Sequence, residues 1–311
     1  MSMRIAFFGT PEFAVPTLRA LAASPHTVAV FTQPDRPVGR KAILTPPPVK
    51  AAALELGLPV YQFEKIRSEE GCAAIRAFGP DLYAVVAFGQ LFSEENLSIP
   101  PLGAINVHGS ILPLYRGASP MQQTVIDGQK MAGVSTMKLV KRMDAGDILL
   151  TAQTPLGENE TYGELSLRLS ELGAELFMET LEQLEAGTLV PVPQEESRAT
   201  YCKMLTRDSG RIDFAASRQA IHNLVRGTNP WPGAYALLGE EKLKLWRTKL
   251  SGESAPEELP VGGLFGDARK GLFLKCPDGV LEVVELQLPG GKKLDGKAFL
   301  RGKNIAGSVL S

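Results

Sequence analysis

The sequence predicts an α/β fold in two parts, a doubly wound and mostly parallel sheet followed by a small OB-like β-barrel. The first part alternates short apolar runs with amphipathic segments, which is the pattern of strands connected by helices. A proline-rich stretch from Val190 to Gln194 then has the composition of an extended linker. From about Thr206, short apolar runs and glycine-rich turns replace this pattern. We therefore expect domains at 1–189 and 206–311, joined by a linker at 190–205.

The strands of the first part are predicted from apolar runs, and its helices from the amphipathic segments between them. Thr10 is suited to cap the first helix, and Pro11 to stand in its first turn. Since helices separate most of the strands, the strands are expected to lie parallel. The predicted strands are Arg4 to Phe8, Val28 to Thr32, Val60 to Phe63, Leu82 to Phe88, Ala104 to His108, Gly133 to Val140 and Ile148 to Pro155. The first predicted helix begins at Thr10. The other four cover Pro48 to Leu56, Glu69 to Phe78, Met121 to Asp127 and Leu165 to Glu185.

The second part is predicted to consist mainly of short strands. A helix at Gln219 to Val225 precedes them, and a final helix is expected to begin near Gly296. Short strands at this density suit a small barrel such as an OB-fold, although a sandwich has a similar pattern. The predicted strands are Ala234 to Leu238, Leu243 to Lys249, Gly262 to Phe265, Leu272 to Lys275 and Val280 to Leu288.

The net charge of the chain gives no sign of a nucleic-acid partner, because 33 basic residues are balanced by 34 acidic ones. The charge is distributed unevenly, however. Residues 206–311 contain 16 Lys and Arg against 12 Asp and Glu, which leaves 17 against 22 for residues 1–205. A basic second domain could contact a polyanion through its own surface. Ordinary variation of surface charge explains the same numbers.

Cysteine and histidine usage predicts no metal site. The chain has three residues of each type, and no group of them has the spacing of zinc ligands. Reduced thiols in a cytoplasmic protein are the expected state. The apolar run at the N-terminus is too short for a signal peptide, and no stretch approaches the length of a membrane span.

The first strand lacks the signature of a dinucleotide site. It ends at Gly9, and the next glycine is Gly39, so no G-x-G-x-x-G follows it. A dinucleotide cofactor is therefore disfavoured in spite of the doubly wound pattern.

Asn106 and His108 are the strongest candidates for chemistry. They are two positions apart near the carboxyl end of a predicted strand, so their side chains leave the same face at the edge where α/β sheets bind ligands. An Asn amide can donate to a developing oxyanion, and an imidazole can exchange protons near neutral pH. Asp144, in the polar loop after a later strand, would orient or polarise His108. A structural role remains the alternative for each residue, and Asp147 is as well placed to form a turn.

The segment around these residues resembles the active-site signature of enzymes that use 10-formyltetrahydrofolate. The likeness rests on Asn106-x-His108-x-x-Ile111-Leu112-Pro113 with Asp144 after it, and it extends over nearly the whole chain. The segments Arg4 to Ala14, Gln33 to Arg40, Pro47 to Lys50 and Asn229 to Ala234 are similar to the branch of this family that formylates an initiator aminoacyl-tRNA. A Rossmann-like catalytic domain of the formyltransferase type is therefore implied.

The resemblance implies transfer of a formyl group from 10-formyltetrahydrofolate to the α-amino group of methionine on initiator tRNA. Asn106 would stabilise the oxyanion, and His108 with Asp144 would move the protons. Ser110 as a covalent nucleophile is the disfavoured alternative. The residues expected to bind folate are Phe88, Gly89, Gln90, Leu91, Ser110, Ile111, Leu112 and Pro113.

Contact with tRNA is expected from two regions of the chain. The segment from Gln33 to Val49 is long, has no clear secondary structure and carries basic residues among prolines. The resemblance implies that it enters the acceptor stem, with Arg40 at the discriminating end. The second region is the OB-like domain, because such barrels often bind nucleic acid. The candidate tRNA contacts are Arg36, Arg40, Lys41, Lys203, Arg207, Lys244 and Arg247.

Four alternatives remain open at this stage. Glycinamide ribonucleotide transformylase has one domain and would not need residues beyond about Leu189. The hydrolase part of formyltetrahydrofolate dehydrogenase would continue into a further module, and a sugar-nucleotide formyltransferase shares the Asn, His and Asp set. A non-catalytic RNA-binding protein is the alternative from another class. The long segment with Arg36 and Arg40 favours tRNA as substrate, and a monomer is the family expectation.

Overall fold

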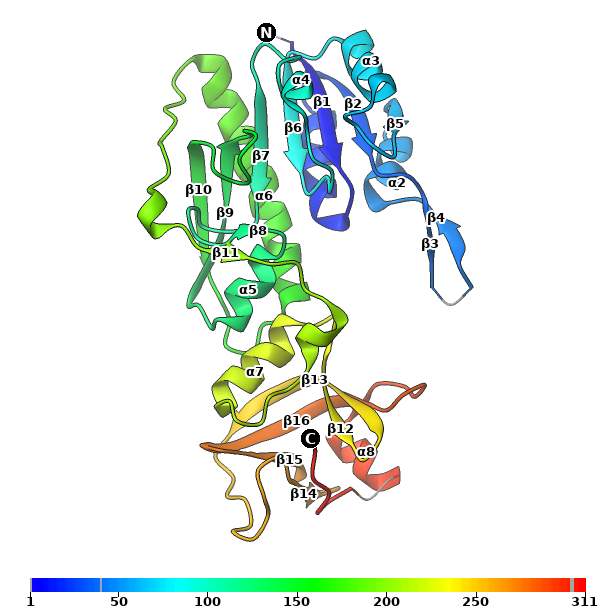
Figure 1. The fold of residues 1–311 in the computed structure, drawn as a ribbon, viewed down its shortest axis with the longest axis vertical. Coiled ribbons are helices and arrows are strands. Elements are labelled where there is room, and N and C mark those ends of the chain that lie inside the picture. Colours follow the sequence, from blue (N-terminus) through cyan, green and yellow to red (C-terminus); the bar gives the residue numbers. More distant parts are fainter. Residues whose placement is uncertain (1, 40, 303–304) are drawn as a thin grey trace. The chain divides into compact units, whose positions relative to one another are not determined.

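The computed structural model describes residues 2–39, 41–302 and 305–311, and it divides into two compact units (Figure 1). The first unit comprises Met1–Pro120, Ala132–Thr154 and Ser166–Cys202. The second comprises Met121–Met131, Pro155–Leu165 and Lys203–Ser311. The second unit thus includes two segments from within the range 1–189, in addition to the C-terminal third of the chain.

The first unit contains a seven-stranded sheet in the order β10-β9-β7-β6-β1-β2-β5. Its strands are β1 (Arg4–Gly9), β2 (Thr27–Thr32), β5 (Val60–Gln62), β6 (Leu82–Val86), β7 (Ala104–His108), β9 (Met131–Lys138) and β10 (Ile148–Pro155). The five adjacent strands β7, β6, β1, β2 and β5 are parallel, whereas β9 is antiparallel to β7. The predicted doubly wound, mostly parallel sheet is confirmed.

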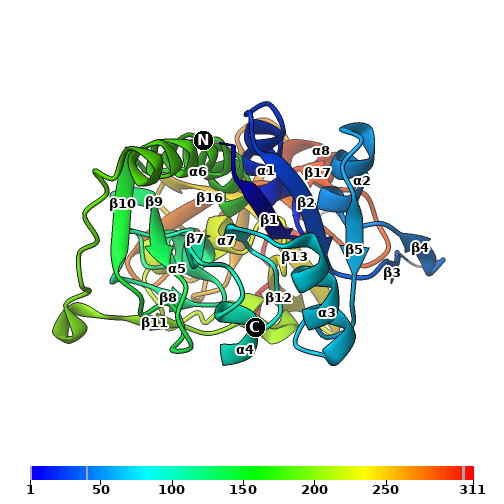
Figure 2. The same cartoon turned by 90° about the horizontal axis from the view of Figure 1, so that it is seen from above.

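Helices cover both faces of this sheet. They are α1 (Val15–Ala22), which follows the 3-10 turn η1 (Glu12–Ala14), α2 (Pro48–Glu55), α3 (Glu69–Phe78), α4 (Glu94–Leu97) and α6 (Tyr162–Ala186). Figure 2 shows α1, α2 and α6 on one side of the sheet and α3 and α4 on the other. The central strands are therefore buried on both faces, and every residue of β6 is buried. Phe8 of β1 lies in the core under α3, where its ring stacks on Phe31 at 4.9 Å.

Two short strands lie in the segment that was predicted to have no secondary structure. β3 (Arg36–Val38) and β4 (Ile43–Thr45) form an antiparallel hairpin, and Figure 1 shows that it extends away from the sheet of the first unit. The prediction of an unstructured segment was wrong here. All residues of both strands are exposed, so the hairpin has no buried face that would impose an alternating apolar pattern.

A second small pairing joins distant parts of the first unit. β8 (Arg116–Gly117) runs parallel to β11 (Tyr201–Cys202), which follows the 3-10 turn η2 (Glu196–Arg198). Through this pairing, the segment predicted as a linker contacts the loop that follows β7. Strands of two residues carry no readable periodicity.

The second unit is built on an antiparallel sheet in the order β12-β13-β16-β15-β14, with β17 paired to β16. Its elements are α5 (Pro120–Ile126), η3 (Arg207–Gly210), α7 (Arg218–Gly227), β12 (Ala234–Leu238), β13 (Glu241–Ser251), β14 (Leu264–Asp267), β15 (Gly271–Cys276), β16 (Gly279–Gln287), β17 (Leu294–Asp295) and α8 (Gly296–Gly302). The C-terminal residues bridge its two edges, because Leu310 pairs with Leu238 after β12 and Val309 pairs with Gly263 before β14. The sheet therefore closes on itself around an apolar core that includes Leu245 and Leu281.

Three properties of the described residues bear on the function. No helix among them is long and apolar enough to cross a membrane. Within the same residues, no group of three or more His, Cys, Asp or Glu side chains could hold a metal ion. Cys72, Cys202 and Cys276 are buried and free of disulfides.

The first turn of α6, in the second unit, is stabilised by a capping box and an ion pair. Glu164 Oε2 accepts from the Thr161 N–H at 2.9 Å, and Glu164 Oε1 accepts from Arg247 Nη2 at 2.6 Å. Burial raises the pKa of Glu164, but the hydrogen bonds from Arg247 and Thr161 outweigh it and lower this pKa to about 2.

This pKa predicts acid destabilisation of the second unit. Because the folded-state pKa of Glu164 lies below its ordinary value of 4.5, its contribution to stability is complete above pH 4.5 and is lost as the pH falls toward 2. Wild type should therefore exceed Glu164→Gln in unfolding free energy at pH 6, and the two should converge near pH 2. Urea unfolding at a series of pH values measures this, with Glu258→Gln as an exposed control. A difference that persisted unchanged to pH 2 would contradict the assignment.

Candidate active site

Strand β7 carries Asn106 and His108 to the carboxyl edge of the parallel sheet. β7 lies between β6 and β9, with Asn106 opposite Met137 and His108 opposite Ser135 on β9. The strand order reverses at β1, whose neighbours are β2 and β6, so the loops after β1, β6 and β7 meet at the edge where such sheets bind ligands.

The His108 ring has one engaged nitrogen and one nitrogen that faces a carboxylate. Its Nε2 lies 2.9 Å from the Tyr115 carbonyl oxygen, and because a carbonyl only accepts, Nε2 carries the proton in the neutral ring. Its Nδ1 lies 3.9 Å from Asp144 Oδ2. His108 is 6% exposed, so the pair is largely screened from water. Nδ1 is therefore the atom that can accept a proton, and the carboxylate would stabilise the resulting imidazolium.

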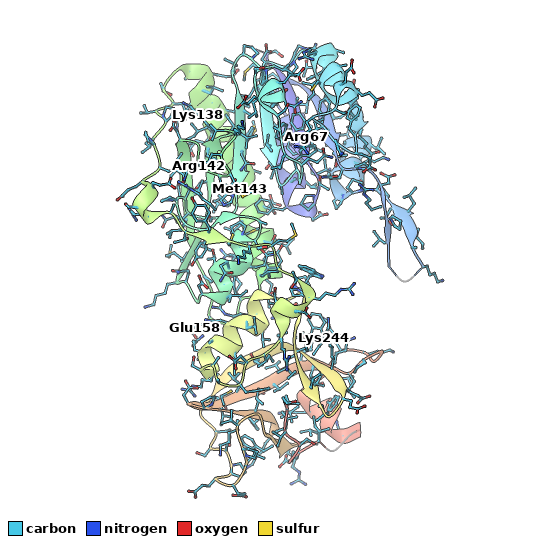
Figure 3. All side chains as sticks on the ribbon, viewed as in Figure 1. Arg67, Lys138, Arg142, Met143, Glu158 and Lys244 are labelled. Atoms are coloured by element: carbon cyan, nitrogen blue, oxygen red, sulfur yellow. The ribbon has the colours of Figure 1, made fainter. Side chains whose placement is uncertain are left out.

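Asp144 is held at this position by the loop between β9 and β10. Its Oδ2 accepts a hydrogen bond of 2.8 Å from the Gly117 N–H, and its backbone has a φ of 48°, in the left-handed region. Figure 3 labels Arg142 and Met143, which precede it in this loop. Asp147 instead pairs with Lys138 at 3.2 Å. Of the two acids in this loop, Asp144, the one predicted to act on His108, is therefore the one that faces the ring.

Strained backbone is concentrated around this pair. Among the described residues other than glycine, Ala42, Ala87, Tyr115 and Asp144 have a positive φ. Ala87 follows β6, Tyr115 accepts from His108, and Asp144 faces His108. Such conformations persist only where surrounding contacts enforce them, and they gather at functional sites.

The Asn106 amide is available to a ligand. The side chain is half-buried, and within the described part of the chain it has no hydrogen-bond partner. An unpaired donor of this kind next to a histidine is suited to stabilise negative charge that develops on an oxygen.

The predicted folate residues form two loops at the same edge, but few of their side chains are free. Phe88 is buried against Phe8, and Gln90 bonds the Ile66 N–H at 2.6 Å and the Phe63 carbonyl at 2.8 Å. Gly89 is exposed, and Leu91 is exposed by 68%.

The second loop, after β7, is more deeply buried than the first. Ser110 is 1% exposed and donates to the Leu114 carbonyl at 2.6 Å, which leaves it poorly placed as a nucleophile. Leu112 is buried, whereas Ile111 and Pro113 are half-buried. Exposed backbone and apolar surface, rather than polar side chains, are what these two loops offer to a ligand.

Arg36 and Lys41, two of the predicted tRNA contacts of the first unit, lie on the β3–β4 hairpin. Arg36 is exposed and forms an ion pair with Glu64 at 2.6 Å, and Lys41 is exposed. Arg40 lies outside the described residues.

The basic residues of the second unit differ in their availability. Arg247 is paired with Glu164, whereas Lys203 and Arg207 are exposed. Lys244 donates to the Pro232 carbonyl at 3.1 Å. Its pKa is lowered by burial and, secondly, by repulsion from three neighbouring cations, Lys293, Lys242 and Arg207.

Aromatic rings accompany these cations, which the sequence reasoning missed. Lys293 and Lys244 lie 3.8 and 4.9 Å from the Trp246 ring, and Lys242 lies 4.4 Å from the Tyr235 ring. The alternation of Lys242, Lys244 and Trp246 along β13 was a signal that could have found this face. We call Arg207, Lys242, Lys244, Lys293 and Trp246 the basic face.

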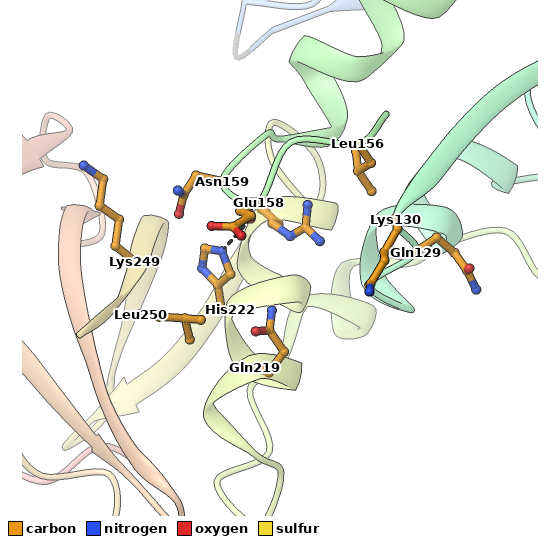
Figure 4. A pocket seen from close by; sticks show the side chains of 11 residues that line it. Gln129, Lys130, Leu156, Glu158, Asn159, Gln219, His222, Lys249 and Leu250 are labelled. Carbon is orange, nitrogen blue, oxygen red and sulfur yellow. Dashed lines mark hydrogen bonds between the residues drawn. The ribbon is translucent and has the colours of Figure 1, made fainter. Parts of the chain in front are cut away.

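A pocket of about 510 Å³ in the second unit contains another histidine (Figure 4). His222 bonds the Glu158 carbonyl at 3.0 Å through Nε2 and Thr248 Oγ1 at 2.9 Å through Nδ1. Burial lowers its pKa, which favours the neutral ring, and both nitrogens are engaged. Arg226 bonds the Gly157 carbonyl of the same segment at 3.0 Å. These side chains hold residues 157–160 against α7, which is a structural role.

The chain also matches known proteins along most of its length. Residues 3–181 match the family described as formyl transferase, and residues 204–304 match the formyl transferase C-terminal domain. The methionyl-tRNA formyltransferase of Citrifermentans bemidjiense is 46% identical over 305 residues, which cover 97% of this chain and 94% of that protein. That of Ruminiclostridium cellulolyticum is 43% identical over 304 residues, 97% of both proteins.

The chain belongs to the formyl transferase family. The resemblance predicted from the sequence is thereby confirmed. The N-formyltransferase from Helicobacter canadensis, in complex with folinic acid and dTDP-3-aminofucose, shares the fold of this formyl transferase. It has a TM-score of 0.66 and 16% identity, covering 94% of this chain and 100% of that one.

The loop that carries Asp144 leaves no room for a larger residue at Gly146. An added Cβ there would lie 1.9 Å from the Lys138 carbonyl oxygen, so the loop would have to move. We expect Gly146→Ala to destabilise the protein by ~1–3 kcal/mol, measured by thermal unfolding. Gly252→Ala is the matched control, because no atom lies within 4 Å of its added Cβ. Equal melting temperatures for Gly146→Ala and wild type would show that the loop is not confined as described.

Proposed function

We propose that this chain transfers the formyl group of 10-formyltetrahydrofolate to the α-amino group of methionine on initiator Met-tRNA. The observation that carries the proposal is 43–46% identity to proteins named methionyl-tRNA formyltransferase along at least 94% of their length. The arrangement of Asn106, His108 and Asp144 supports the same chemistry. An enzyme that acts on aminoacyl-tRNA would work in the cytoplasm, and we propose that it does so as a monomer.

Asn106 would stabilise the negative charge of the tetrahedral intermediate. When the amine nitrogen bonds to the formyl carbon, the carbonyl π electrons move to the formyl oxygen. A half-buried amide without a protein partner is free to donate to that oxygen, since it has no bond in the protein to break first. The donor contributes because the hydrogen bond is stronger to the oxyanion than to the neutral carbonyl.

His108 would move the proton between the two nitrogens. Nδ1 takes a proton from the amine that has attacked, and the Asp144 carboxylate 3.9 Å away stabilises the imidazolium. The same proton then passes to the folate nitrogen as its bond to the formyl carbon breaks. The products are formyl-Met-tRNA and tetrahydrofolate, and His108 returns to its neutral state.

The loop after β6 fits a flat ligand with an apolar face and polar edges. Leu91 offers exposed apolar surface, and the exposed Gly89 leaves its backbone open to approach. Such loops can hold a folate ring through backbone groups. The half-buried Ile111 and Pro113 would line the opposite loop.

The β3–β4 hairpin and the basic face would bind the tRNA. Exposed Val38, Ile43 and Leu44 give the hairpin apolar surface next to its cations. On the basic face, the buried Trp246 ring holds the ammonium groups of Lys244 and Lys293, which can neutralise phosphates.

Asp144 and Asp147 provide a matched pair for testing the site. We expect Asp144→Asn to lower kcat for formyl transfer to initiator Met-tRNA by ~10²–10⁴-fold, since it removes the charge beside His108. Asp147→Asn should retain near wild-type kcat, because Asp147 pairs with Lys138. Acid-gel separation of formyl-Met-tRNA measures both, with a sugar-nucleotide amine as second acceptor for the wild-type enzyme.

The same assay tests the proposed acceptor, the role of Asp144 and the proposed reaction independently. Turnover of the sugar amine without turnover of Met-tRNA would overturn the proposed acceptor. Equal losses in both Asn variants would overturn the role of Asp144. Inactivity of the wild type with both acceptors would overturn the proposed reaction.

The basic face predicts salt-sensitive tRNA binding. Lys244→Ala should weaken binding of initiator tRNA and reduce the slope of log affinity against log salt concentration by about 1. Lys270→Ala, an exposed lysine outside the basic face, is the control. Filter binding at several salt concentrations measures both variants. An unchanged slope in Lys244→Ala would exclude a phosphate contact by this residue.

A further inference from the structure

We propose that Gln194, fixed by the buried Arg116, is a positioning residue that holds Asp144 beside His108. The inference rests on the proposed function for its kinetic consequence. Gln194 belongs to the segment predicted as a linker, and it lies outside the strands and loops to which the sequence assigned chemistry.

Gln194 donates both of its amide hydrogens to the Asp144 loop. Its Nε2 donates to the Asp144 carbonyl at 2.8 Å and to the Gly146 carbonyl at 2.7 Å. These bonds fix the backbone on both sides of Ala145. Asp144 needs such support, because its φ of 48° is unfavourable for a residue with a side chain.

Arg116 dictates which way the Gln194 amide faces. Its Nε donates to Gln194 Oε1 at 3.0 Å, so the NH₂ group must point to the Asp144 loop. Arg116 is fully buried, and its Nη1 bonds Glu196 at 3.0 Å and the Tyr201 hydroxyl at 3.2 Å. A fully buried guanidinium with hydrogen bonds to three side chains is held in one orientation.

The same two residues of β8 hold the backbone and the carboxylate of Asp144. Arg116 acts on the backbone through Gln194, while the Gly117 N–H bonds the carboxylate at 2.8 Å. A third connection is the ion pair between Arg142, in the Asp144 loop, and Glu196. Displacement of Gln194 would therefore leave the carboxylate attached to Gly117 while its backbone is free to move.

Glutamine is required at 194 because the position needs an acceptor on one side and donors on the other. An ionised Glu could still accept from Arg116, but it would place a carboxylate oxygen against the Asp144 and Gly146 carbonyls. Gln194→Glu and Gln194→Ala thus remove the support in two different ways. Since Gln194 is only half-buried, both changes are compatible with folding.

The test measures formyl transfer to initiator Met-tRNA by the full chain. We expect each Gln194 variant to lose ~10- to 100-fold in kcat, with KM values and melting temperature close to wild type. Gln183→Glu, the same chemical change on α6, should leave kcat unchanged. The double variant Gln194→Ala/Asp144→Asn should lose no more than Asp144→Asn alone, because Gln194 acts through Asp144. Multiplied losses in the double variant, or wild-type kcat in both single variants, would overturn the proposal.

A second measurement needs no catalysis. The ring resonances of His108, assigned from their loss in His108→Gln, should shift in Gln194→Ala in the same direction as in Asp144→Asn. The resonances of His26 and His222 should remain in place. An unmoved His108 resonance in Gln194→Ala overturns the inference even if the enzyme forms formyl-Met-tRNA. A shift in an enzyme inactive toward Met-tRNA would support the positioning role while the proposed function fails.

Discussion

The candidate site depends on one short segment, Tyr115 to Gly117, that fixes both members of the His108–Asp144 pair. The Tyr115 carbonyl accepts from His108 Nε2 at 2.9 Å, and the Gly117 N–H donates to Asp144 Oδ2 at 2.8 Å. The first bond decides which ring nitrogen faces the carboxylate, and the second decides which oxygen faces the ring. The geometry of the pair is therefore set by backbone groups, and the side chain between them, Arg116, is free to act as an anchor.

Most of the large sheet could be predicted because its signals are local. Helix α3 (Glu69–Phe78) begins after a Ser68 side chain that accepts from the Gly71 N–H, and it ends at Gly79 in the left-handed conformation. Strand β7 has apolar residues on both faces, since helices cover both sides of the sheet. Once this strand was predicted, Asn106 and His108, two positions apart, were expected on the same face of it. In such elements, the caps and the hydrophobic pattern that determine the helix or strand lie within about ten residues of it.

The rest could not be predicted because its causes are distant in sequence or absent from the pattern. The β3–β4 hairpin has no buried face, so no alternation records it. Asp144 was predicted from the family resemblance, but its contact with His108 depends on a left-handed residue within a seven-residue polar loop, where Asp147 is an equally normal turn former. The contact of Arg116 with Tyr201 spans 85 residues. Each of these features is decided by packing between segments, which the composition of one segment does not contain.

The segment 182–203 shows how little the composition of a segment says about its contacts. It lies between the two matched family ranges, 3–181 and 204–304, and its proline-rich sequence has the composition of a spacer. In the structure it supplies Gln194 and Glu196, and its strand β11 pairs with β8 beside Asp144. The first compact unit accordingly extends to Cys202. Because these contacts converge on the Asp144 loop, a unit that ended at residue 189 would keep Asn106, His108 and Asp144. It would lose Gln194, Glu196 and β11, which hold the Asp144 loop in place.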